Sequence, residues 1–158
     1  KGFMGMRNFI IQDSEGRKLA WANSNWTHLD ISTGLPARLT PADTDNYVLG
    51  EKMEMDYAPR KIKLPEDMIA QEAFTVQKHH LDTNHHVNNC QYVCMAEDFL
   101  PESFKIYQMR AEYKMQAKLG DVICPKVKTE TDKVVVSLDN IEGKAYAIVE
   151  FLKKEGDI

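Results

Sequence analysis

The chain has 158 residues, the length of one domain or of one domain with part of a second. It carries 24 acidic and 20 basic residues, for a net charge of −4. This balance argues against binding to duplex nucleic acid, which requires clustered lysine and arginine to displace counterions from phosphates. Hydrophobic residues make up 43 % of the chain, enough for a packed core. No apolar run approaches the roughly 18 residues that span a bilayer.

The cysteine content argues against a disulfide scaffold or a structural zinc site. Cys90, Cys94 and Cys124 are odd in number and include no C-x-x-C pair, which favours a reducing compartment. Cys90 and Cys94 are four residues apart in a predicted helix, where we expect both thiols to be buried like small hydrophobic side chains.

The first part of the chain predicts a β-hairpin followed by a linker. Residues 3–12 and 19–31 are predicted strands on either side of a turn at residues 13–16. Residues 41–68 are rich in proline and charge without a clear period, which predicts a linker with one helical turn near residues 43–47.

The second part predicts an antiparallel meander with one helix. Residues 73–79 predict a strand, and residues 89–99 a helix with an asparagine as N-cap and Pro101 beyond its end. Residues 105–117 alternate most clearly and predict a long strand. Strands at 122–131, 133–138 and 144–152 complete the α+β meander, in which Pro125 indicates an edge or a bulge.

A short internal similarity suggests a duplication. Glu15-Gly16-Arg17 precedes Ala20 with the spacing that Glu142-Gly143-Lys144 has before Ala147. Glycine-containing hairpin turns are common, so the match alone is weak. If it reflects a duplication, residues 1–40 are the C-terminal part of a first domain and residues 69–158 are a complete second domain.

The polar run before the predicted helix carries the candidate chemistry. Asp82, Asn84 and His86 occupy alternate positions, so on an extended segment their side chains project to one side. An imidazole, with a reference pKa of about 6.5, can take a proton from water, while an amide orients a carbonyl and helix N–H groups stabilise an oxyanion. These groups suit hydrolysis of an activated acyl group. A loop whose Asp and Asn merely turn and cap the chain explains the same residues equally well.

A metal site is a weaker alternative for this run, and we expect neither a metal ion nor a cofactor. Adjacent histidines on a strand point to opposite faces, so only half of them converge, and no H-E-x-x-H spacing is present. The sequence also lacks G-x-S-x-G, G-x-x-x-x-G-K and G-x-G-x-x-G motifs. The histidines and carboxylate weighed for a metal are His79, His80, His85, His86 and Asp82.

Residues 82–89, with Tyr92 three positions further on, resemble the D-x-N-x-H-V-N-N-x-x-Y signature of acyl-acyl carrier protein thioesterases. These belong to the hot-dog superfamily, in which a curved antiparallel sheet wraps around a helix. The similarity extends over nearly the whole chain and implies two hot-dog domains, with this sequence beginning inside the first. Its first-domain matches are Arg7-Asn8-Phe9, Gly16, Ser24, Trp26, Asp30, Thr33-Gly34 and Arg38.

The resemblance also implies roles for individual residues. His86 would activate water or assist attack, Asn84 would orient the substrate carbonyl, and Asp82 would position or polarise both. Gln116 aligns with a fourth catalytic position that is usually Glu in relatives, and Ala117 with a neighbouring Cys. A carboxylate base at 116 and a cysteine nucleophile at 117 are therefore excluded, which leaves His86 or Asp82 as the base. The substrate-binding residues expected are Asn88, Asn89, Tyr92 and Trp26.

The partner implied is acyl carrier protein bearing a phosphopantetheine-linked acyl chain, from which a fatty acid is released in fatty acid biosynthesis. Because the carrier is acidic, we expect a basic docking face on this chain. Any single lysine on a strand has an alternative explanation, since lysines also deter pairing between exposed sheet edges. Unprotected edges of an incomplete first domain predict a homodimer. The compartment implied is the bacterial cytoplasm, or the plastid stroma in a plant. The candidate docking residues are Arg60, Lys61, Lys63 and Lys78, or Lys114, Lys118, Lys126 and Lys128.

Two other functions fit the sequence. A hot-dog thioesterase acting on acyl-coenzyme A would use Asp82 as base or nucleophile. A non-catalytic module that binds acyl groups is compatible with Gln116 in place of a carboxylate.

Overall fold

The computed structural model describes residues 2–154 and divides the chain into two compact units, Lys1–Arg60 and Lys61–Ile158. The first unit is built on an antiparallel hairpin of β1 (Met4–Gln12) and β2 (Lys18–Thr27), followed by the short helix α1 (Pro41–Thr44). The hairpin turn forms because the Asp13 carboxylate accepts the N–H groups of Glu15 and Arg17 at 3.0 and 2.9 Å. The predicted hairpin is confirmed, although β2 ends four residues before the predicted boundary at Ile31.

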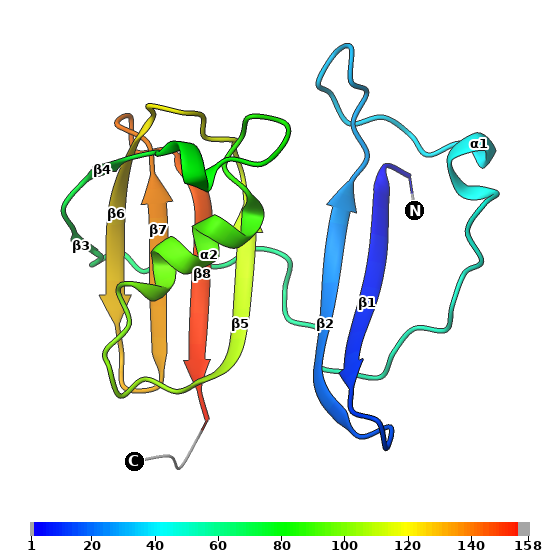
Figure 1. Ribbon diagram of the computed structural model, residues 1–158, viewed down its shortest axis with the longest axis horizontal. Helices are drawn as coiled ribbons and strands as arrows, with labels where there is room; N and C mark the ends of the chain where they lie inside the picture. The colour runs from blue at the N-terminus through cyan, green and yellow to red at the C-terminus, as the bar shows by residue number, and fades with distance from the viewer. Residues whose placement is uncertain (1, 155–158) are drawn as a thin grey trace. The chain divides into compact units, whose positions relative to one another are not determined.

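The second unit is an antiparallel sheet with one helix across it (Figure 1). Its strands in spatial order are β3 (Ile69–Ala70), β6 (Val122–Thr129), β7 (Lys133–Asp139), β8 (Ala145–Lys153) and β5 (Ile106–Tyr113). The short strand β4 (Phe74–Thr75) also pairs with β6. The predicted α+β class and the predicted meander β6–β7–β8 are confirmed.

Pro125 explains why the outer neighbour of β6 is divided. β3 pairs with Val127 and Lys126, whereas β4 pairs with Ile123 and Val122, so neither strand lies opposite the proline, which has no N–H to offer a ladder. The Pro125 carbonyl instead accepts the N–H of Gln71 at 2.9 Å. The predicted strand at 73–79 is therefore wrong beyond Thr75, and its end forms a 3₁₀ turn at Lys78–His80.

The helix α2 (Asn89–Glu97) packs on one face of the sheet. Tyr92, Met95 and Ala96 point into a core formed with alternate residues of β7 and β8. The side chain of Asn88 caps the helix by accepting the N–H of Cys90 at 2.9 Å, as the sequence predicts. Cys90 and Cys94 are exposed rather than buried, because they lie on the face of α2 turned away from that core.

The opposite face of the sheet is covered by the chain that precedes β3. Ile62 is 6 % exposed and packs with Val135 and Ile148, and Met68 joins the same cluster. Residues 61–68, the end of the predicted linker, therefore belong to the second unit, whereas residues 41–60 belong to the first. Strand β7 is buried on both faces, which is why its run of three valines shows no alternation. No helix among residues 2–154 is both long and apolar enough to cross a bilayer.

Candidate active site

The polar run before α2 forms a tight turn rather than the extended segment expected. The N–H of Asp82 donates to the His86 carbonyl at 2.8 Å, and the N–H of His85 donates to the Asp82 carbonyl at 3.1 Å. Leu81 and Val87 pair across the base of the turn, and His85 adopts the left-handed conformation with φ 60°. The expectation that alternate side chains project to one side of a strand is therefore wrong, because strand periodicity does not apply to a closed turn.

The carboxylate of Asp82 causes this turn. It accepts the N–H groups of Asn84 at 2.8 Å and of His86 at 3.3 Å, so it replaces the partners that a strand ladder would supply. Partial burial raises the pKa of Asp82, but those two N–H groups, the His86 imidazole and the Asn84 amide outweigh it, and the net pKa is lowered. The three candidate groups thus lie within electrostatic reach of one another even though the segment is not extended.

The exposure of the three groups differs. The Asn84 side chain is exposed at the tip of the turn, whereas Asp82 and His86 are half-buried. The exposed Asn84 amide and the half-buried His86 imidazole are both within reach of a ligand, while Oδ1 of the Asp82 carboxylate is bonded to the backbone. The arrangement can supply a base and an orienting amide, with Asp82 holding both in place.

Gln116 lies on a second segment that runs beside this turn. The predicted strand at 105–117 ends at Tyr113, because the N–H groups of Lys114 and Met115 both donate to the Tyr146 carbonyl, at 2.8 and 3.2 Å, and the chain leaves the sheet. Lys118 then forms an antiparallel bridge with His86, and the Ala117 carbonyl accepts the N–H of Val87 at 2.9 Å. Gln116 is therefore an exposed residue next to the His86 turn rather than a strand residue.

The remaining expected binding residues have diverse surroundings. Asn88 caps α2, and the carbonyl of Asn89 accepts the Tyr113 hydroxyl at 3.2 Å. Tyr92 is only 2 % exposed, and its hydroxyl oxygen accepts the N–H of Ala117 at 2.8 Å. Trp26 belongs to the first unit, where its indole N–H donates to the Ser24 hydroxyl at 2.7 Å and the Arg7 guanidinium stacks on its ring.

The histidines form no metal-binding cluster within the described part of the chain. Within residues 2–154, no three His, Cys, Asp or Glu side chains are placed to hold a metal ion. The rings of His79 and His80 meet edge to face at 4.1 Å, and the His80 ring accepts the N–H of Gln77 at 2.9 Å. Burial and the neighbouring His79 lower the pKa of His80.

Sequence reasoning missed the residues that hold the second segment. Tyr146 on β8 donates its hydroxyl to the Asp121 carboxylate at 3.2 Å, and that carboxylate accepts the Lys118 N–H at 2.9 Å. Burial, together with Asp121, raises the pKa of Tyr146 to about 12. A Gly-Asp pair such as Gly120-Asp121 is typical of a turn, but nothing local indicates its tyrosine partner.

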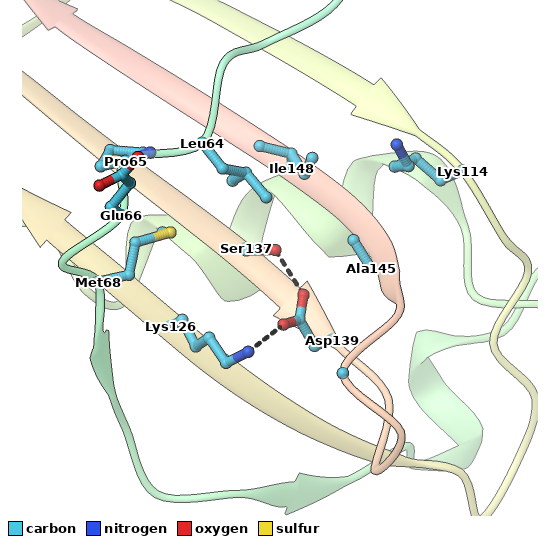
Figure 2. Close-up of a pocket in the computed structure, with 11 residues that line it drawn as sticks. Leu64, Pro65, Glu66, Met68, Lys114, Lys126, Ser137, Asp139, Ala145 and Ile148 are labelled. Carbon is cyan, nitrogen blue, oxygen red and sulfur yellow. Dashed lines mark hydrogen bonds and ion pairs between the residues drawn. The ribbon is translucent and has the colours of Figure 1, made fainter.

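A cavity of about 480 Å³ lies on the sheet face opposite α2. Figure 2 shows the residues that line it. Its floor is polar: the Ser137 hydroxyl donates to the Asp139 carboxylate at 2.5 Å, and Lys126 forms an ion pair with the same carboxylate at 2.9 Å. These three polar groups therefore have their hydrogen-bond and charge partners among themselves. Leu64 and Met68 form apolar walls of the cavity. The cavity shares no residue with the Asp82 turn, so we do not assign it to the same site.

Comparison with known proteins points to one family. The family model described as the acyl-ACP thioesterase C-terminal domain matches residues 62–151. No curated protein matches the chain.

Several solved structures share the fold. An acyl-ACP thioesterase from Bacteroides thetaiotaomicron superimposes with a TM-score of 0.83 at 19 % identity, over 98 % of this chain and 64 % of its own. A 12:0-ACP thioesterase from Umbellularia californica superimposes with a TM-score of 0.79 at 18 % identity, over 97 % of this chain and 62 % of its own. A putative oleoyl thioesterase from Lactobacillus plantarum superimposes with a TM-score of 0.73 at 20 % identity, over 98 % of this chain and 65 % of its own. The chain thus spans less than two thirds of the length of these proteins and has their hot-dog fold.

Proposed function

Since the chain belongs to the acyl-ACP thioesterase family through its C-terminal domain, we propose that the complete protein hydrolyses the thioester of acyl-acyl carrier protein and releases a fatty acid. The observation that carries the proposal is the turn at residues 82–86, in which the Asn84 amide and the His86 imidazole both lie near Asp82 and the His86 backbone pairs with Lys118, two residues from Gln116. The relatives named above, one of them a 12:0-ACP thioesterase, support the same substrate class.

His86 is the proposed general base. An imidazole is the side chain best suited to accept a proton from water near neutral pH, and general-base catalysis typically contributes ~10²–10⁴-fold. Asn84 orients the thioester carbonyl from the exposed tip of the turn. Asp82 shapes the turn, because its Oδ1 accepts two backbone N–H groups. Gln116 can hold a water or the substrate by hydrogen bonding, but a neutral amide cannot take the proton.

The docking surface is proposed to include Lys118. Three other lysines considered for docking are already paired: Lys114 with Glu112, Lys126 with Asp139, and Lys128 with Asp67. Lys118 is exposed on the segment that pairs with His86, so its ammonium group is available near the turn. A cation there suits the phosphate of the pantetheine arm and the acidic surface of the carrier.

We also expect copies of the chain to pair, in the bacterial cytoplasm or the plastid stroma. The β1–β2 hairpin exposes large apolar side chains, and such surfaces are commonly covered in an assembly. Light scattering of the complete protein tests the pairing, and a monomeric mass would contradict it. The exposed side chains of this hairpin include Met6, Ile11, Leu19 and Trp21.

The activity is tested by measuring free thiol released from acyl-acyl carrier protein and from acyl-coenzyme A, side by side, with equal acyl chains. The proposal predicts faster hydrolysis of the carrier-protein substrate. Faster hydrolysis of the coenzyme A ester would favour an acyl-coenzyme A thioesterase. Binding of both substrates without hydrolysis would indicate an acyl-binding module.

A further inference from the structure

The two peptide groups that flank the Ala117 side chain are each held by a hydrogen bond in the interior of the second unit. Its N–H donates to the Tyr92 hydroxyl at 2.8 Å, and its carbonyl accepts the N–H of Val87 at 2.9 Å. Ala117 is completely buried, so neither peptide group can turn to solvent for a replacement partner. The bond to Tyr92 joins this segment to α2, and the bond to Val87 joins it to the turn that carries His86.

The ends of the same segment are held by β8, independently of Tyr92. The Tyr146 carbonyl accepts the N–H groups of Lys114 and Met115, and the Tyr146 hydroxyl donates to the Asp121 carboxylate. That carboxylate also accepts the N–H of Lys118. Loss of the Tyr92 hydroxyl would therefore leave both ends of the segment and the Ala117 carbonyl attached, and would release only the peptide N–H that follows Gln116.

Gln116 is the residue at the centre of this segment. It lies outside any strand, its side chain is exposed, and the peptide that follows it is the one Tyr92 holds. We propose that Tyr92 is a positioning residue whose hydroxyl fixes the Ala117 peptide and thereby holds Gln116 beside the His86 turn. This inference rests on the proposed function and gives the buried Tyr92 a positioning role in place of the substrate binding expected from the sequence.

The test is Tyr92→Phe in the complete protein, assayed on acyl-acyl carrier protein. The substitution removes one oxygen atom and keeps the ring. Misplacing a catalytic group by about 1 Å can cost up to ~10²-fold, so we expect a kcat loss of ~10-fold with KM changed less than about twofold. Tyr113→Phe is the matched control: its ring packs 6.1 Å from that of Tyr92, but its hydroxyl bonds to Asn89 and not to the Gln116 segment. Its kcat should equal that of the wild type.

A double-mutant cycle separates positioning from general stability. If Tyr92 acts through Gln116, then Tyr92→Phe should have little further effect on kcat in a Gln116→Ala background. Amide hydrogen exchange should also accelerate at Ala117 in Tyr92→Phe. If that variant does not fold, replacing the Ala117 amide by an ester removes the same hydrogen bond while Tyr92 remains, and the same loss of kcat is expected.

Three results would overturn the inference. Wild-type kcat in the Tyr92→Phe or ester protein would show that the bond does not position the site. An equal loss of kcat in the presence and absence of the Gln116 side chain would show that Tyr92 acts elsewhere. Absence of hydrolysis by the wild type would remove the proposed function and this inference together, whereas the first two results leave the proposed function standing.

Discussion

The backbone of His86 pairs with that of Lys118 in an antiparallel bridge, so the signature turn before α2 and the segment that follows β5 meet at the candidate site. This pairing explains why Gln116 lies near the turn although the whole of α2 and β5 separates them in the sequence. It also places an exposed cation on the same segment as Gln116.

Asp82→Asn and Asp82→Ala should separate the structural role of this carboxylate from a role as base. The Asn side-chain carbonyl can still accept one or both of the backbone N–H groups that form the turn, whereas Ala cannot. We expect Asp82→Asn to retain hydrolysis within ~10-fold of the wild type, and Asp82→Ala to lose ~10²-fold or more. Equally large losses in both variants would show that the negative charge itself is required.

The same carboxylate should contribute to acid sensitivity. Because the pKa of Asp82 is lowered in the folded state, its stabilising bonds are complete above the unfolded pKa of about 3.9 and are lost as the pH falls through the lower, folded value. The free energy of unfolding, measured by denaturant titration from pH 6 downward, should therefore fall less steeply with acid in Asp82→Asn. An identical slope in the two proteins would contradict this assignment.

Gln116→Glu should change the pH dependence of hydrolysis. A carboxylate beside the His86 turn would couple to the imidazole and shift the acidic limb of the pH–rate profile. The side chain is exposed, so the fold should be unaffected. A profile that matches the wild type in rate and shape at every pH would place Gln116 outside the site.

Lys118→Glu should weaken recognition of the carrier protein. Reversing a charge near the turn should raise KM for acyl-acyl carrier protein at low salt, with a smaller effect at high salt, because exposed charges are screened. Lys133→Glu is the matched control, since Lys133 lies at the opposite end of the sheet and pairs with Glu130. Equal effects of the two substitutions on KM would argue against a docking role for Lys118.

Tyr146→Phe should reduce the sensitivity of the fold to alkali. Burial raises the pKa of Tyr146 from 10.0 to about 12, so the stability due to its protonated form is complete below pH 10 and is lost as the pH rises toward 12. Burial also raises the pKa of Tyr92 and Tyr113. Because these two tyrosines remain, the free energy of unfolding of Tyr146→Phe should still fall at high pH, but less steeply than that of the wild type. Denaturant titrations at pH 9 to 12 measure this difference. Tyr107→Phe, at an exposed tyrosine, should behave like the wild type.

The sequence predicted the elements whose signals are local. The start of α2 follows from the capping chemistry of Asn88, and the meander β6–β8 follows from apolar runs separated by turns. The end of β5 could not be predicted, because it depends on the Tyr146 carbonyl, which is distant in the sequence and accepts two successive N–H groups.

The candidate site shows the same division. Residue type alone predicts Asp82, Asn84 and His86 as candidates, but strand periodicity wrongly predicts an extended segment where they form a turn. An Asp followed two residues later by an Asn is also a turn signal, and here the local bond to the backbone prevails over strand periodicity. The contact between Tyr92 and Ala117 joins two distant segments, and no spacing within either one indicates it.

The decisive test of a catalytic site at this turn is the hydrolysis of acyl-acyl carrier protein by the wild type and by His86→Ala, with fatty acid and free carrier thiol quantified together. The neighbouring His85→Asn is the control, because asparagine tolerates the left-handed conformation found at that position. We predict that the wild type and His85→Asn hydrolyse the substrate at the same rate, and that each releases fatty acid and free thiol in equal amounts. A folded His86→Ala protein should be at least ~10²-fold slower. Equal rates for all three proteins would contradict a catalytic site at this turn.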